Sequence, residues 1–103
     1  MLHAKVASVS VIDPGTMKKF KVAGKDIVIY NCNGKFYATT NVCVHMGGPL
    51  GDGELNCPRV TCPWHGWRYD VRSGKGEPPA DPGAEIAAYK VTVKENEIWV
   101  DVP

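Results

Sequence analysis

Two short cysteine–histidine pairs constrain the fold of this chain more than any other feature of its sequence. One residue separates Cys43 from His45, two residues separate Cys62 from His65, and sixteen residues lie between the two pairs. Thiolates and imidazoles together bind zinc and the irons of iron–sulfur clusters. All four side chains can bind one metal group only if the two segments meet in space. The fold must therefore bring two loops together at one site.

The composition is that of one small globular domain. The chain has 103 residues, 44% hydrophobic and 22% charged, with a formal net charge of +1. It contains no run of like charges, so we expect no nucleic-acid or membrane partner. No apolar run is longer than the four residues 27–30, which is too short to cross a bilayer, and charged residues interrupt residues 1–20 where a signal peptide would be apolar. We expect a cytoplasmic protein.

Short alternating apolar segments with turn residues between them predict an all-β fold. The predicted strands cover residues 6–11, 17–23, 26–32, 35–40, 86–94 and 97–102. The first strand should end at the turn formed by Asp13, Pro14 and Gly15. Asn33-Gly34 and Glu95-Asn96 each separate two strands by two residues, which predicts two tight hairpins. No segment has a convincing helical pattern.

The middle of the chain has a different character. Residues 41–81 are rich in glycine and proline and contain little periodic apolar sequence. A bound metal group can supply folding energy to such a segment directly. We therefore predict a single domain, residues 1–103, in which residues 1–40 and 82–103 form a β base and residues 41–81 form a loop-rich cluster-binding lobe.

The segments around the two pairs resemble the Rieske family, in particular the small Rieske-type ferredoxins that supply ring-hydroxylating oxygenases. The resemblance covers nearly the whole chain and rests on Cys43-Val44-His45-Met46-Gly47-Gly48-Pro49-Leu50, Gly51-Asp52-Gly53, Cys62-Pro63-Trp64-His65-Gly66-Trp67-Arg68-Tyr69-Asp70, Ser73-Gly74 and Pro78-Pro79. It implies an antiparallel β sandwich that holds one Rieske [2Fe–2S] cluster per chain. It also implies that Cys43 and Cys62 bind the buried iron, and that His45 and His65 bind the outer iron.

The main alternative for these four residues is a zinc site, because two cysteines with two histidines are also a zinc ligand set. Zinc fingers usually keep the two cysteines together and the two histidines together. Here each pair is mixed. The spacing therefore favours the cluster.

The residues beside the ligands are candidates for tuning the cluster. Gly47, Gly48 and Gly66 let the backbone approach the cluster, while Trp64 and Trp67 would shield its thiolate side. The resemblance aligns Gly48 and Trp64 with two cysteines that form a disulfide in the Rieske proteins of cytochrome bc complexes. It aligns Trp67 with a serine that hydrogen-bonds a cluster sulfur. Fewer hydrogen bonds to sulfur predict a potential toward the low end of the roughly −150 to +300 mV Rieske range.

Tyr69 is expected to raise the reduction potential. The resemblance aligns it with a tyrosine that hydrogen-bonds a ligand thiolate in the high-potential branch, whereas oxygenase ferredoxins often have phenylalanine. If the Tyr69 hydroxyl reaches Cys43, the potential should lie somewhat above that of a relative with phenylalanine.

Five apolar residues near the ligands are candidates for a partner-docking surface. They are Met46, Pro49, Leu50, Trp64 and Pro79. Exposed apolar patches commonly mark interaction sites. The alternative is that the same residues only cover the cluster.

Two cysteines remain outside the pairs. A pair with the spacing of the second motif would need a histidine three residues after Cys57. Val60 occupies that position, so Cys57 cannot begin the second motif. We expect Cys32 and Cys57 to be free thiols, the usual state of intracellular cysteines, and give a disulfide between them less weight.

The function implied by the resemblance is electron transfer rather than catalysis. The chain would carry one electron at a time from an NAD(P)H-dependent flavin reductase to a terminal oxygenase, as a monomer that makes transient contacts. Two alternatives stay open. The chain could be a cluster-bearing small subunit or module of a larger reductase such as nitrite reductase, or it could donate electrons to a diiron monooxygenase.

Overall fold

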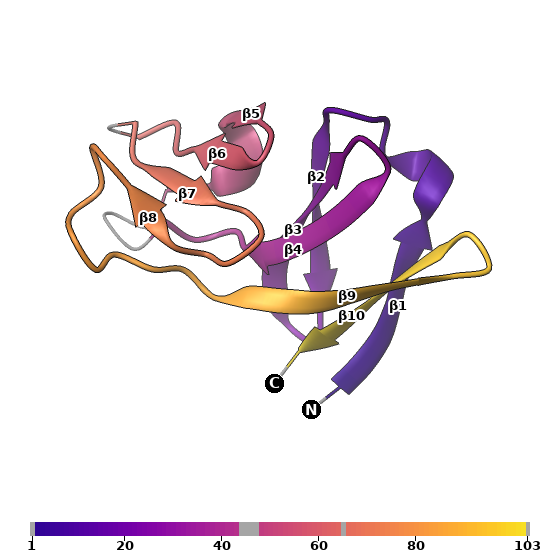
Figure 1. Cartoon of the computed structure of the whole chain (residues 1–103). Coiled ribbons are helices and arrows are strands. Elements are labelled where there is room, and N and C mark those ends of the chain that lie inside the picture. The colour runs from indigo at the N-terminus through magenta and orange to yellow at the C-terminus, as the bar shows by residue number, and fades with distance from the viewer. Residues whose placement is uncertain (1, 44–47, 65, 103) are drawn as a thin grey trace.

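The computed structural model describes residues 2–43, 48–64 and 66–102, and in these residues the fold is all-β and antiparallel, as predicted (Figure 1). The strands are β1 Leu2–Ser8, β2 Met17–Val22, β3 Lys25–Cys32, β4 Lys35–Thr40, β5 Glu54–Asn56, β6 Arg59–Thr61, β7 Arg68–Asp70, β8 Gly76–Glu77, β9 Ala88–Lys94 and β10 Glu97–Val102. Two 3₁₀ turns accompany them, η1 Val9–Val11 and η2 Leu50–Asp52. No helix in the described part of the chain could cross a membrane.

The strands form two sheets. The larger one has the order β1-β10-β9-β4-β3-β2, and the smaller one has the order β5-β6-β7-β8. The larger sheet curls, so that its edge strands β1 and β2 also approach each other. All strands of the smaller sheet lie between residues 41 and 81, and Figure 1 shows them to one side of the larger sheet. The two cysteine–histidine pairs thus lie in the segment that builds the smaller sheet.

The predicted hairpins are confirmed by their turn geometry. Asn33 and Gly34 have φ values of 56° and 88°, and Glu95 and Asn96 have φ values of 53° and 63°. Two successive positive φ values match the right-handed twist of the adjoining strands. The prediction for the first strand was wrong at both ends, because β1 already begins at Leu2 and residues 9–11 form η1. The partner strand β10 begins at Glu97, so the strand pairing ends at Ser8, and the Val9 N–H then donates to the Asn96 carbonyl in the turn at 2.9 Å.

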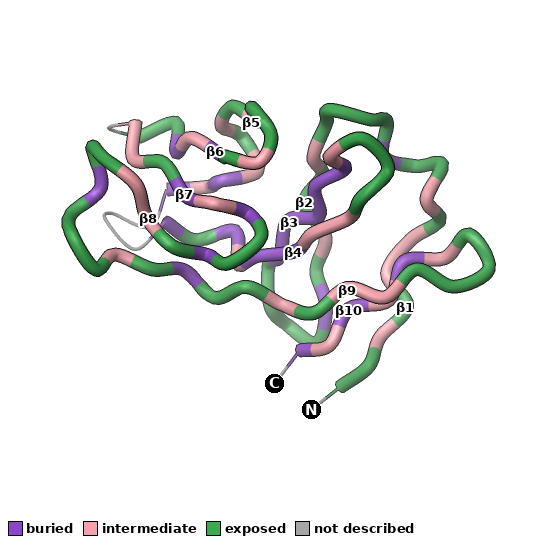
Figure 2. The backbone as a smooth tube through the Cα atoms, in the orientation of Figure 1, coloured by how far each residue is buried: buried purple, intermediate pink, exposed green. Residues whose placement is uncertain are grey.

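Strand β3 lies between two hydrophobic cores and contributes side chains to both. Ile27 and Ile29 pack into the core of the larger sheet, whereas Val28 and Tyr30 pack into a second core with side chains of the smaller sheet. Successive side chains of a strand point to opposite faces, so one continuous apolar run serves both cores. All four side chains are fully buried, and Figure 2 colours this part of β3 as buried.

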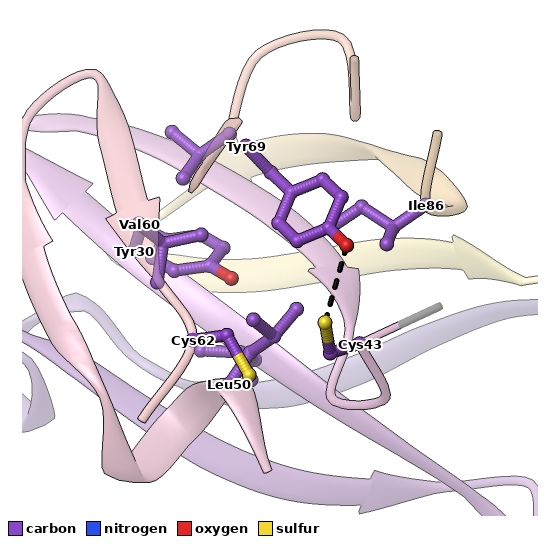
Figure 3. Packing of buried hydrophobic residues seen from close by; sticks show 9 residues of the cluster. Tyr30, Cys43, Leu50, Val60, Cys62, Tyr69 and Ile86 are labelled. Carbon is purple, nitrogen blue, oxygen red and sulfur yellow. Dashed lines mark hydrogen bonds between the residues drawn. The ribbon is translucent and has the colours of Figure 1, made fainter. Parts of the chain in front are cut away.

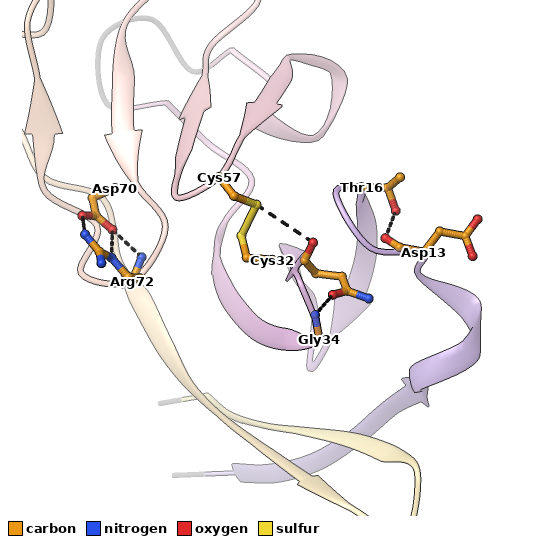
Figure 4. The surroundings of a disulfide bond; sticks show 8 residues. Asp13, Thr16, Cys32, Gly34, Cys57, Asp70 and Arg72 are labelled. Atoms are coloured by element: carbon orange, nitrogen blue, oxygen red, sulfur yellow. Dashed lines mark hydrogen bonds and ion pairs between the residues drawn. A yellow bond between two sulfur atoms is a disulfide. The ribbon is translucent and has the colours of Figure 1, made fainter.

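The expectation that Cys32 and Cys57 are free thiols was wrong, because they form a disulfide (Figure 4). Cys32 ends β3 and Cys57 lies in the turn between β5 and β6, 25 residues later. Their Cα atoms are 5.7 Å apart, within the usual range for a disulfide. The turn of the smaller sheet packs against the end of β3, and this tertiary contact places the two sulfurs together.

Candidate metal centre

The two candidate ligand loops are closed in the same way. The Cys43 N–H donates to the Gly48 carbonyl at 3.0 Å, and the Cys62 N–H donates to the Trp67 carbonyl at 2.8 Å. In both cases the cysteine donates to the residue five positions later. The first loop follows β4, and the second joins β6 to β7. Each cysteine is therefore held at the first position of a closed loop.

The structure brings the two cysteines together in one buried site. Cys43 is 1% exposed and Cys62 is 2% exposed, and both belong to the core that contains Val60 and Tyr69. Figure 3 shows the two sulfurs directed into the same region. Among the residues described, no group of three or more histidine, cysteine, aspartate or glutamate side chains comes together. The two thiols are the described half of the predicted ligand set.

The other half of the predicted ligand set, His45 and His65, lies outside the described residues. Met46 and Gly47, which were predicted to belong to the docking and tuning sets, also lie outside them.

The electrostatics of the thiols fit a cationic metal group. Burial raises the pKa of the Cys62 thiol, the Trp64 N–H at 3.4 Å from its sulfur lowers it in part, and the adjacent Cys43 raises it again. Burial and the neighbouring sulfur of Cys43 therefore disfavour the thiolate form of Cys62. A bound metal removes that obstacle by supplying positive charge to both sulfurs.

The Tyr69 hydroxyl does reach Cys43, which was the condition for its expected effect on the potential. Its hydroxyl oxygen lies 3.1 Å from the Cys43 sulfur, and the side chain is fully buried (Figure 3). A metal-bound thiolate carries no proton, so in that state the tyrosine hydroxyl would donate to the sulfur. A hydrogen bond to a charged group is among the stronger ones in proteins.

Gly48 and Trp64 pack against each other across the two loops. A Cβ atom at Gly48 would lie 2.8 Å from the Cys62 sulfur and 3.1 Å from two ring atoms of Trp64, so the close approach requires glycine. These are the positions that the resemblance aligns with the disulfide cysteines of the high-potential branch. In this chain, the Trp64 ring packs on the Gly48 backbone and connects the two loops at that point.

The other two tuning candidates also lie beside the second loop. Gly66 has a φ of 72°, a conformation that glycine adopts without steric cost. Trp67 is partly buried and packs against the core that holds the two thiols.

The candidate docking residues separate into exposed and buried ones. Trp64 is 48% exposed, Pro79 is exposed and Pro49 is partly exposed. The prediction for Leu50 was wrong, because its side chain is fully buried in the core of the smaller sheet. It begins η2, where its N–H donates to the Asn41 carbonyl at 2.8 Å and the chain turns inward.

Asn41 is a positioning residue that the sequence analysis missed. It is 6% exposed, and its side-chain oxygen accepts the Gly51 N–H at 2.7 Å. Its own N–H donates to the Asp26 carbonyl at 3.0 Å, at the start of β3. Both ends of the first ligand loop are thereby attached to the larger sheet. An asparagine directly after a strand and two residues before Cys43 was the available signal, since asparagine commonly bonds nearby backbone in turns.

Gly53 supports the second loop, and we expect Gly53→Ala to destabilise the protein strongly. A Cβ atom there would lie 1.9 Å from the Thr61 carbonyl oxygen, and Thr61 directly precedes Cys62. The backbone must shift, so the free energy of unfolding should fall by about 3 kcal/mol. Urea denaturation followed by circular dichroism measures this.

The matched control for this variant is Gly83→Ala. A Cβ atom at Gly83 meets nothing within 4 Å, although φ is 83°. Only the backbone conformation opposes this alanine, so the free energy of unfolding should fall by about 1 kcal/mol. An equal loss of unfolding free energy in Gly53→Ala and Gly83→Ala would show that the close contact with Thr61 does not affect stability.

Comparison with known proteins places this geometry among iron–sulfur proteins. The family model described as the Rieske [2Fe-2S] domain matches residues 3–90. Ferredoxin CarAc of Metapseudomonas resinovorans is 32% identical over 98 residues, which cover 93% of this chain and 90% of that protein.

Solved structures agree with the sequence comparisons. The ferredoxin of carbazole 1,9a-dioxygenase from Nocardioides aromaticivorans IC177 matches with a TM-score of 0.91 and 29% identity, covering 100% of both chains. A second match comes from a complex of reduced oxygenase and oxidized ferredoxin in carbazole 1,9a-dioxygenase. It has a TM-score of 0.86 and 30% identity, and covers 95% of this chain and 91% of that one.

Proposed function

Because this chain belongs to the Rieske [2Fe–2S] domain family, we propose that it is a one-electron carrier between an NAD(P)H-dependent flavin reductase and a terminal oxygenase. Its cofactor is a Rieske-type [2Fe–2S] cluster, which when bound accepts and releases one electron. The observation that carries the proposal is the match to a ferredoxin over 93% of this chain and 90% of that protein. The chain itself would catalyse no reaction.

We assign the inner iron to Cys43 and Cys62, and the outer iron to His45 and His65. The burial of both thiols and the hydroxyl of Tyr69 beside Cys43 support this assignment. The apolar core around the sulfurs would exclude water from the inner side of the site. Residues 41–81 would be the cluster-binding lobe of a single domain, with residues 1–40 and 82–103 as its base.

The partner-docking surface would surround the tip of the two loops. Exposed Trp64 and Pro79 and partly exposed Pro49 support this location, and Met46 belongs to the same segment of the sequence as Pro49. The solved complex of an oxygenase with its ferredoxin supports the choice of partner class. A carrier must leave one partner before it meets the next, so we propose a cytoplasmic monomer with transient interfaces. Stable stoichiometric co-purification with one larger protein would instead favour a reductase subunit.

Electron paramagnetic resonance before and after dithionite tests the proposal. The expected result is a rhombic signal that appears only on reduction, with the low average g value that nitrogen ligands give. The reduced protein should then pass its electron to a terminal oxygenase and return to the silent state. A colourless protein that contains zinc would overturn the carrier function.

The Tyr69→Phe variant should lower the reduction potential. The hydroxyl that donates to the Cys43 sulfur stabilises the more negative reduced state more than the oxidised state. A difference of about 1 kcal/mol between the two states corresponds to roughly 40 mV for one electron. Redox titration of both proteins measures the shift, and Tyr30→Phe is the control because the Tyr30 hydroxyl lies 2.8 Å from Thr39 instead. An unchanged potential in Tyr69→Phe would show that the hydrogen bond does not tune the site.

A further inference from the structure

The Cys32–Cys57 disulfide lies where a thiol from solution can reach it. Cys57 is exposed, whereas Cys32 is partly buried and packs against the core of the smaller sheet. Exposed disulfides are generally more labile than buried ones. In a reducing compartment such as the cytoplasm, a disulfide that persists is unusual and is commonly redox-active.

The disulfide connects both candidate ligand loops to the larger sheet. The segment that it closes, residues 32–57, contains Cys43. Cys57 precedes β6, and Cys62 directly follows β6. One covalent bond therefore restrains the segment that carries the first cysteine ligand and the strand that ends at the second.

The other contacts of the turn that contains Cys57 restrain it less strongly against the larger sheet than the disulfide does. Val71 N–H donates to the Pro58 carbonyl at 2.9 Å, and this bond stays within the smaller sheet. Toward the larger sheet, the Cys57 sulfur lies 4.0 Å from the Asn31 carbonyl oxygen. Because that contact is long, the disulfide is the strongest of these restraints between the turn and the larger sheet.

We propose that Cys32–Cys57 is a thiol-exchange site whose substrate is a dithiol reductant, and that its reduction weakens the retention of the cluster. The second part rests on the ligand assignment made under the proposed function. The oxidised protein holds both ligand loops against the larger sheet. The reduced protein keeps its hydrophobic cores, but its smaller sheet opens more readily.

The exchange balances as two successive thiol–disulfide steps. A thiolate of the reductant attacks the sulfur of Cys57, the more exposed of the two residues, forming a mixed disulfide, and Cys32 leaves as a thiolate that takes up a proton. The second thiolate of the reductant then attacks its own sulfur in the mixed disulfide and releases Cys57. Two electrons pass to the protein, and the dithiol becomes a disulfide. Cys57 leaves as a thiolate that takes up a proton, and the resulting thiol can donate a weak hydrogen bond to the Asn31 carbonyl.

The first test counts thiols in the cluster-bearing protein. The native protein is alkylated with and without dithiothreitol pretreatment, and the modified cysteines are located by peptide mass spectrometry. We expect Cys32 and Cys57 to be modified only after pretreatment. Modification without dithiothreitol, or resistance to dithiothreitol in the folded protein, would overturn the exchange site. This count does not depend on the cluster, so it separates failure of this proposal from failure of the proposed function.

The second test measures cluster retention. After removal of dithiothreitol under nitrogen, EDTA is added and the loss of visible absorbance is followed. Reduction should speed this loss by about tenfold, since the lobe opens more often without the cross-link. The Cys32→Ser/Cys57→Ser double variant should lose absorbance at the fast rate with or without pretreatment. Equal rates for oxidised and reduced wild-type protein would overturn the link to cluster retention.

Discussion

Replacing either Cys43 or Cys62 by alanine should abolish the reduced-state paramagnetic signal and leave a colourless protein. Each thiol is fully buried at the site where the two loops meet, so water cannot easily replace the lost sulfur. One iron would keep a single thiolate, and a cluster with an incomplete ligand set is not retained. Iron and sulfide analysis, together with spectra before and after dithionite, measures the loss.

The matched control for the ligand variants is the Cys32→Ser/Cys57→Ser double variant. It removes two cysteines from the same chain but leaves both candidate ligands in place. We expect it to bind iron in the wild-type amount when no chelator is present. A Cys43→Ala protein with wild-type iron content would disprove the ligand assignment.

Removal of the Cys32–Cys57 disulfide should lower the free energy of unfolding by about 3 to 4 kcal/mol. The bond joins residues 25 positions apart, and closing a segment of that length restricts the unfolded chain by roughly this amount in the chain-entropy model. Urea denaturation followed by far-ultraviolet circular dichroism compares the wild-type protein with the Cys32→Ser/Cys57→Ser variant.

Reduced wild-type protein provides an independent measurement of the same quantity. Its stability in dithiothreitol should match that of the double variant, which should itself be insensitive to dithiothreitol. A loss below about 0.5 kcal/mol in both comparisons would mean that the disulfide does not contribute to global stability.

Local patterns predicted the strands of the larger sheet, except for the bounds of β1. Asn33-Gly34 and Glu95-Asn96 tolerate positive φ, and both turns have it. The run from Ile27 to Tyr30 was recognised as apolar, but its alternation between two cores requires a second layer that packs on β3. The error at residues 9–11 arose because strand length depends on the length of the partner strand, here β10.

The short cysteine–histidine motifs were sufficient to predict that two distant cysteines meet. Cys43 and Cys62 were predicted as one site, and the structure brings them together. The contact between Tyr69 and Cys43 spans 26 positions and was inferred only through the family resemblance. Asn41 was missed because its role consists of hydrogen bonds to backbone groups, which give no side-chain pattern.

The sequence by itself determined the all-β class, the hairpin turns and the type of metal chemistry, because each depends on neighbouring residues. The tertiary structure alone decided which apolar residues near the ligands are accessible, burying Leu50 and leaving Trp64 exposed. It also decided that Cys32 and Cys57 form a bond rather than remain free. Both outcomes depend on how the smaller sheet packs against β3. That packing results from many weak contacts between distant segments, which no local pattern records.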